Sequence, residues 1–92
     1  MSRDIHVTLA ERGARYGEFR EHARITQDIK AAMRDSGNWQ AMSASNQEAL
    51  EMIAHKIGRT LNGDPDYHDS WHDIAGYAML VADQLSSEEA AA

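Results

Sequence analysis

The sequence predicts an all-α protein: a compact bundle of three main helices that follow a short N-terminal lead-in. Helix breakers are few, with one proline and six glycines in 92 residues, and β-branched residues are sparse, which disfavours strands. Apolar residues recur at helical spacing in three segments separated by turn-forming residues. At this length, with 42% hydrophobic and 26% charged residues, we expect one globular domain over residues 1–92.

The first main helix is expected from Phe19 to about Arg34. Gly13 and Gly17 interrupt the segment before it, so this lead-in is expected to be short and either irregular or helical. One face of the helix carries Phe19, His22, Thr26, Ile29 and Met33. The Ser-Gly-Asn sequence at residues 36–38 has turn chemistry and should end the helix.

The second helix is expected to begin at Ser45, which would cap it together with Glu48 in a capping box. Its apolar stripe consists of Leu50, Ile53, Ala54, Ile57 and Leu61, and the turn at residues 62–65 ends it. The third helix should begin within residues 67–70, with a stripe of Trp71, Ile74, Ala75, Ala78, Val81 and Leu85. Residues 86–92 are expected to be a tail, so the ordered core is placed at about 9–85.

The last helix has further apolar character at Gly76, Met79 and Leu80, which lie away from its main stripe. A helix that is apolar on two sides needs a neighbour on both sides. We therefore expect oligomerisation to complete the bundle, as a homodimer or a higher homo-oligomer. The alternative is that the N-terminal lead-in folds over this second face.

Hydropathy argues against membrane insertion. The sequence has no run of about 18 apolar residues and no apolar N-terminal stretch, so neither a membrane span nor a secretory signal is expected. It also has no cysteine, which excludes disulfides and thiolate chemistry. These features fit a cytoplasmic protein.

Charge is distributed unevenly along the chain. Residues 1–35 hold seven Lys and Arg against six Asp and Glu, whereas residues 36–92 hold two against nine. An acidic half argues against binding to a phosphate backbone, so nucleic acid is not an expected partner. The acidic residues could bind a cation, dock a basic partner or only keep the protein soluble.

Two carboxylate pairs stand out in the acidic half. Glu48 and Glu51 share one helix face at i, i+3, and Asp69 and Asp73 share another at i, i+4. Mg²⁺ prefers oxygen ligands, and four carboxylates of this kind could hold it. Antiparallel packing of the two helices would separate the pairs, so a common site would need a partner subunit or an offset packing. The alternative is that all four are solvated helix-surface charges near helix N-termini.

The remaining polar residues have simple alternatives to a functional role. Lys56 and Arg59 could contact phosphates, or could pair with nearby acids on the helix surface. His68 and His72 have a zinc-compatible spacing but lack a clear further ligand, so surface positions are expected. Three aromatic residues could stack on a base or belong to the core, namely Tyr67, Trp71 and Tyr77.

The chain resembles small phage and prophage proteins of unassigned function over about residues 9–85. The similarity is carried by Arg-Tyr-Gly-Glu-Phe at residues 15–19, Glu-Ala-Leu-Glu-Met-Ile-Ala-His-Lys-Ile-Gly-Arg at 48–59, Leu-Asn-Gly-Asp-Pro-Asp-Tyr at 61–67 and Asp-Ser-Trp-His-Asp-Ile-Ala-Gly-Tyr-Ala at 69–78. These proteins in turn distantly resemble the MazG-like all-α nucleotide pyrophosphohydrolases. The resemblance implies the cytoplasm of a bacterial host.

The MazG-like resemblance implies helical dimers or tetramers that cleave a nucleoside triphosphate to the monophosphate and pyrophosphate with Mg²⁺. It makes Glu48, Glu51 and Asp73 metal ligands and Asp69 a fourth ligand or the residue that orients water. Lys56 or Arg59 would then contact phosphate. The second acidic pair departs from the family pattern, because Ser70 stands where an acid is expected and the acid lies at Asp69. This departure indicates either a working variant or lost catalysis.

Two non-catalytic functions remain open beside the enzymatic one. A small acidic protein could bind and inhibit a host or anti-phage defence component, with its acidic half as the docking surface. A relative without turnover could also keep the nucleotide pocket and act as a binder. Fold-level similarity does not choose among the three, because function depends on the site.

Overall fold

The computed structural model describes residues 4–91 and is all-α, as the sequence predicts. The helices are α1 (Ile5–Tyr16), α2 (Phe19–Arg34), α3 (Ala44–Asn62) and α4 (His68–Ala91), with a 3-10 turn, η1 (Trp39–Ala41), before α3. No strand occurs within residues 4–91. The chain therefore has four α-helices in this range rather than three, because the lead-in forms a regular helix.

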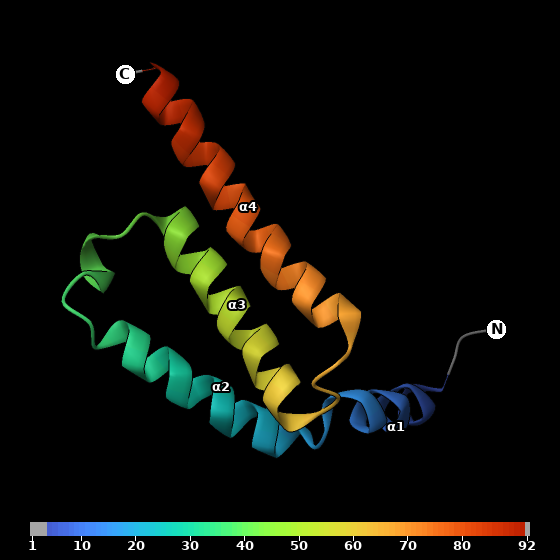
Figure 1. Cartoon of the computed structure of the whole chain (residues 1–92). Helices are drawn as coiled ribbons and strands as arrows, with labels where there is room; N and C mark the ends of the chain where they lie inside the picture. Colours follow the sequence, from blue (N-terminus) through green and yellow to red (C-terminus); the bar gives the residue numbers. More distant parts are fainter. Residues whose placement is uncertain (1–3, 92) are drawn as a thin grey trace.

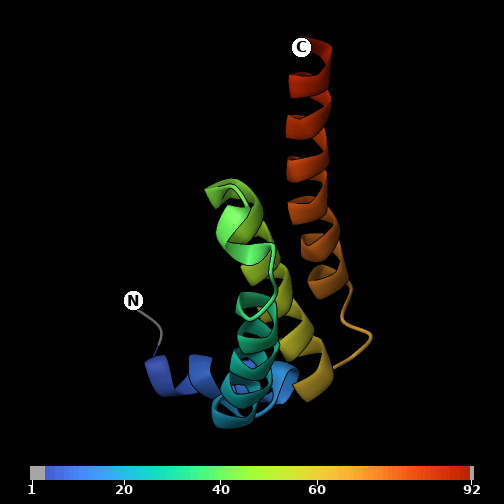
Figure 2. The same cartoon turned by 90° about the vertical axis from the view of Figure 1, so that its left-hand side faces the viewer.

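Helix α3 is the centre of the bundle (Figure 1). It packs against α2 on one side and against α4 on the other, and α1 makes smaller contacts with α2 and α3. Helices α3 and α4 run antiparallel, and α1 lies across the end of the α2–α3 pair (Figures 1 and 2). The lead-in therefore does not lie along α4. This excludes the alternative to oligomerisation in which the lead-in would cover the second apolar face of the last helix.

Helix α1 forms because its first turn is capped. The carboxylate of Asp4 accepts a hydrogen bond from the backbone N–H of His6 at 2.8 Å, which satisfies one of the free donors at the helix start. Gly13 lies within the helix without breaking it. Gly17 ends the helix in the left-handed region, with φ of 79°, where glycine is favoured.

Helix α3 begins earlier than predicted. Ser43 is its cap, and its Oγ accepts a hydrogen bond from the backbone N–H of Asn46 at 3.1 Å. The predicted cap, Ser45, lies inside the helix, so the capping box with Glu48 does not form. The side-chain amide of Gln47 donates to the Trp39 carbonyl at 2.6 Å, which fixes the first turn against η1 and explains the earlier start.

Helix α4 is longer than predicted. It continues through the segment expected to be a tail and ends at Ala91. Ser86 and Ser87 do not stop it, because the glutamates and alanines that follow are good helix formers. The last turns of α4 extend beyond α3 in Figure 1. Within residues 4–91, no helix is both long enough and apolar enough to cross a membrane.

The core is thin and made of small residues. Within the described chain, the buried hydrophobic residues are Trp39, Ala49 and Ala54, and the buried polar residues are His22, Thr26 and Ser70. The predicted α2 face is therefore buried at His22 and Thr26, whereas Phe19 is 79% exposed. The predicted α3 stripe is buried at Ala54 and exposed at both ends, Leu50 and Leu61.

A hydrogen-bonded clamp fixes the α1–α2 junction to the end of α3. The Asn62 side-chain amide donates to the carbonyls of Tyr16 at 3.0 Å and Glu18 at 2.8 Å. The backbone N–H of Asp64 donates to the Arg15 carbonyl at 2.8 Å. The approach is close, since a Cβ at Gly17 would collide with Asn62. The clamp thereby sets the position of α1 over the α2–α3 pair.

Candidate functional site

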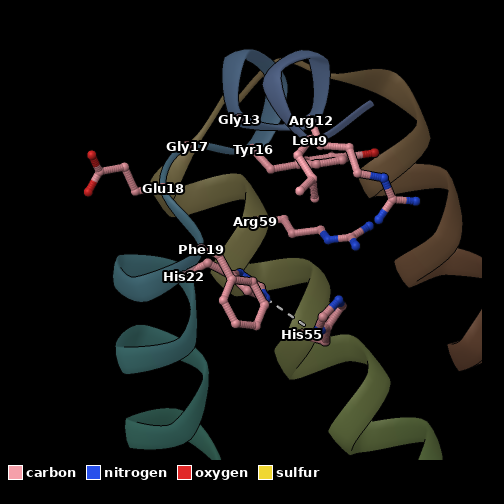
Figure 3. Close-up of a pocket in the computed structure, with 10 residues that line it drawn as sticks. All are labelled: Leu9, Arg12, Gly13, Tyr16, Gly17, Glu18, Phe19, His22, His55 and Arg59. Carbon is pink, nitrogen blue, oxygen red and sulfur yellow. Dashed lines mark hydrogen bonds between the residues drawn. The ribbon is translucent and has the colours of Figure 1, made fainter. Parts of the chain in front are cut away.

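A cavity of about 530 Å³ lies where α1, the start of α2 and the second half of α3 meet. Figure 3 shows its lining, which combines aromatic rings, cationic groups and imidazoles. The lining residues are Leu9, Arg12, Gly13, Tyr16, Gly17, Glu18, Phe19, His22, His55 and Arg59. Ligand pockets commonly have this size and a mostly apolar wall with a few convergent polar groups.

Two guanidinium groups give the cavity positive charge. Arg12 comes from α1 and Arg59 from α3, and Figure 3 shows both extending to the same side of the cavity. The guanidinium carbon of Arg59 lies 4.3 Å from the centre of the Tyr16 ring, which is cation–π geometry. Glu18 is the one acid in the lining, and its side chain points away from the two arginines (Figure 3). The cavity is therefore complementary to an anion.

Two histidines form the floor of the cavity between α2 and α3. Nε2 of His22 and Nδ1 of His55 are 3.3 Å apart, and the two rings meet edge to face with centroids 4.6 Å apart. His22 is buried, and its Nδ1 lies 3.5 Å from the hydroxyl of Thr26. A hydrogen bond between the imidazoles requires one nitrogen to donate and the other to accept, so at least one ring is neutral.

The surroundings keep both imidazoles neutral at pH 7. Burial, and then the positive charges of Arg59, His22, Lys56 and Lys30, lower the pKa of His55 to about 4. Burial is also the main cause that lowers the pKa of His22, with a smaller opposing effect from the Gly58 backbone. Low dielectric and nearby cations both disfavour the imidazolium form. The cavity thus combines fixed positive charge with neutral hydrogen-bonding groups.

This arrangement predicts a loss of stability in acid. The folded-state pKa of His55, about 4, lies below the ordinary value of 6.5, so the unfolded chain binds the proton more readily. The stabilisation is complete above pH 6.5 and is lost as the pH falls towards 4. We expect a decrease of about 1 kcal/mol in the free energy of unfolding, reduced from the full linkage energy because His55 is only half-buried.

Urea unfolding at a series of pH values, followed by circular dichroism, measures this loss. The matched variant is His55→Gln, whose amide can still bond to His22 but does not titrate. Between pH 4 and 6.5 the variant should lose less stability than the unmodified protein. Equal pH dependence in the two proteins would contradict the assignment of this loss to His55.

The sequence-predicted cations have different environments. Arg59 lines the cavity, as described above. The ammonium of Lys56 instead lies 2.9 Å from the carboxylate of Asp73 on α4. This ion pair links α3 to α4, and the hydrogen bond from Lys56 is the main cause that lowers the pKa of Asp73.

The four predicted carboxylates do not meet within the described chain. Glu51 lies near Lys30 at 3.8 Å and Arg34 at 3.5 Å on α2, and Asp69 accepts a hydrogen bond from the Tyr67 hydroxyl at 3.0 Å. Glu48 lies in a separate groove between α3 and the C-terminal half of α4. Among residues 4–91, no group of three or more His, Asp or Glu side chains is placed to hold a metal. Within residues 4–91, the four carboxylates therefore do not form one common site.

The other predicted aromatic and histidine positions are structural or exposed. The rings of His68 and His72 stack on the surface with centroids 5.7 Å apart. The guanidinium carbon of Arg15 lies over the Tyr67 ring, 4.6 Å from the ring centre. The Trp71 indole N–H donates a hydrogen bond to the Pro65 carbonyl at 2.9 Å. These contacts tie the turn before α4 to its neighbours.

The sequence patterns did not predict a functional role for most residues that line the cavity. Arg12, Tyr16 and Phe19 lie around Gly17, and His22 follows one turn later. The available signal was local: basic and aromatic residues alternate around a glycine that can turn the chain. It remained ambiguous because the facing residues, His55 and Arg59, are more than thirty positions away.

The comparisons with known proteins identify a family but no activity. A family model described as a domain of unknown function (DUF6378) matches residues 3–85. No curated protein and no solved structure gave a match.

Proposed function

Because the chain belongs to the DUF6378 family, a domain of unknown function, we propose its role from the cavity itself. The protein binds a small ligand that combines an aromatic ring with an anionic group, and a nucleotide is the class that fits best. The observation that carries this proposal is the placement of two arginines, two neutral histidines and two aromatic rings around one cavity of about 530 Å³. Such convergent polar groups in an apolar pocket favour ligand binding.

The proposed binding mode assigns a separate role to each kind of group. Arg12 and Arg59 contact the phosphate, because guanidinium groups form bidentate hydrogen bonds to phosphate oxygens. The exposed ring of Phe19 and the imidazole of His55 offer faces for the base, since aromatic rings stack with offset geometry. Tyr16 holds the Arg59 guanidinium in place through its ring.

Binding without turnover is the form of the nucleotide hypothesis that the geometry supports best. Lys56 neutralises Asp73, and Lys30 and Arg34 lie against Glu51. Mg²⁺-dependent pyrophosphohydrolase activity stays a prediction from the MazG-like resemblance. It would require these carboxylates to leave their cationic partners and to meet Glu48 and Asp69, for example across subunits. We also propose, independently of the ligand, that the protein forms a homo-oligomer and lies in the cytoplasm of a bacterial host.

A two-dimensional NMR titration localises the ligand. Adenosine, guanosine, cytidine and uridine monophosphates and triphosphates are added to ¹⁵N-labelled protein without metal. The backbone signals of residues 12–22 and 55–59 should move most, because these segments surround the cavity. Shifts concentrated instead around Glu48 and Asp73 on the other side of α3, or no shifts with any nucleotide, would contradict the proposal.

A pyrophosphate-release assay separates binding from turnover. The protein is incubated with nucleoside triphosphates and Mg²⁺, and Glu51→Gln serves as the comparison. We expect no release that exceeds that of the variant, because the carboxylates are not gathered in the described chain. Release that Glu51→Gln abolishes would establish the enzymatic function and overturn the binding-only proposal.

A further inference from the structure

The chain exposes more surface than a monomer of its size should. Its accessible area is 6748 Å², about 1,400 Å² more than the roughly 5,400 Å² expected for a compact 10.3 kDa protein. Its radius of gyration is 16.0 Å, against about 12 Å for a globular domain of this length. A standard protein–protein interface takes about 800 Å² from each partner. The excess is therefore large enough for one full interface.

Helix α4 carries an apolar seam that runs along the edge of its contact with α3. The seam consists of Trp71, Ala75, Ala78, Ala82 and Leu85, all of them exposed. Their spacing alternates between four and three residues, which is the heptad repeat that aligns side chains along one edge of a helix. Beside the seam, Asp73 pairs with Lys56 of α3. Val81 lines a groove with α3 residues, and Ala78 of the seam borders the same groove.

All five seam residues stay exposed within residues 4–91. Trp71 is 57% exposed and Leu85 45% exposed. Met79 flanks the centre of the seam and is 59% exposed, and a Cβ added at Gly76 would have no heavy atom within 4 Å. Figure 2 shows α4 standing apart from the other helices except on its α3 side. A helix face with this apolar heptad spacing can be covered by a second helix.

The seam is complementary to itself in the antiparallel direction. It has one large residue at each end and three alanines between them, so the order of large and small residues is nearly the same in both directions along the helix. When two copies run antiparallel with Ala78 at the centre, Trp71 of each copy meets Leu85 of the other. The alanines allow the two backbones to approach closely, and a two-fold axis there also brings Met79 beside its own copy. Self-complementarity of this kind is what an isologous two-fold interface requires.

We propose that a second copy of this chain covers the seam, forming a two-fold dimer through antiparallel pairing of α4 with α4 about Ala78. The two α3–α4 hairpins then form a four-helix arrangement with α4 at its centre. This pairing buries the surface that the thin monomer core leaves exposed. It does not depend on the ligand proposed for the cavity, which is lined by α1, α2 and α3.

Sedimentation equilibrium of the full chain at micromolar concentration tests the dimer. The unmodified protein should have twice the 10.3 kDa mass of one chain. Ala82→Glu places charge in the seam and should raise the dimer dissociation constant by about 100-fold or more. The matched control is Leu80→Glu, which adds the same charge to α4 at a position 68% exposed and outside the seam, and it should remain dimeric. A monomeric unmodified protein, or dissociation by Leu80→Glu but not by Ala82→Glu, would overturn the proposal.

Single cysteines test the direction of pairing and keep the test valid if Ala82→Glu fails to fold. The chain has no cysteine of its own, so any disulfide-linked dimer reports the introduced residue. Ala78→Cys should cross-link readily under mild oxidation. Leu85→Cys should not, because seven residues from the centre separate the two copies by about 21 Å in an antiparallel pair. Equal cross-linking at both positions would indicate parallel pairing and contradict the proposal.

Discussion

Gly58→Ala is expected to lower the free energy of unfolding by about 2–3 kcal/mol. A Cβ at this position would collide with the Thr26 hydroxyl and approach Nδ1 of His22 to 3.1 Å. Both neighbours are buried on α2, so they cannot turn away without opening the contact between α2 and α3. The gain in helix propensity from glycine to alanine, about 1 kcal/mol, offsets only part of this cost.

Gly13→Ala is the matched control for this substitution. Gly13 also lies within a helix, but a Cβ there would meet nothing within 4 Å. It should therefore stabilise the protein by about 0.5–1 kcal/mol through helix propensity alone. Urea unfolding followed by circular dichroism at 222 nm gives both values. Equal stability of the two variants would show that Gly58 is not needed for the close packing of α2 on α3.

Arg59→Gln is expected to weaken nucleotide binding by about 10- to 100-fold, the effect of losing one charge-assisted contact. The glutamine keeps a polar side chain of similar reach but removes the positive charge beside Tyr16. Fluorescence anisotropy with a labelled nucleotide measures the change. The thermal stability of the variant should stay close to that of the unmodified protein, because Arg59 is at the cavity wall rather than in the core.

Arg15→Gln provides the control for charge and for stacking. Arg15 also lies over a tyrosine ring, that of Tyr67, at 4.6 Å, but it does not line the cavity. We expect its variant to bind nucleotide with nearly unchanged affinity. If both variants weaken binding equally, the effect is one of general surface charge, and the cavity is not the site.

Local sequence signals predicted most of the helical structure and misjudged its ends. Apolar spacing located α2, α3 and α4, because burial of one face imposes the helical period. The start of α3 was placed at Ser45 rather than Ser43, since both serines are good caps and the deciding contact comes from Gln47 to Trp39. The lead-in contains Gly13, whose cost to a helix is small enough for the rest of α1 to outweigh.

The site was less predictable because it depends on contacts between distant segments. Carboxylate spacing correctly placed Glu48 with Glu51 and Asp69 with Asp73 on shared helices. The pairing of Lys56 with Asp73 depends on how far α4 is offset along α3, which no local pattern records. The cavity depends in the same way on the Asn62 clamp, which joins residues 44 or more positions apart.

Isothermal titration calorimetry of the unmodified protein tests the proposed nucleotide binding most directly. Nucleoside monophosphates are compared with the matching nucleosides and with inorganic phosphate, in the absence of metal. The arrangement of Arg12, Arg59, Phe19 and His55 predicts that at least one nucleotide binds about tenfold or more tightly than its nucleoside and than phosphate alone. If every nucleoside binds as tightly as its nucleotide, or if no nucleotide binds at millimolar concentration, the cavity is not a site for an aromatic anion.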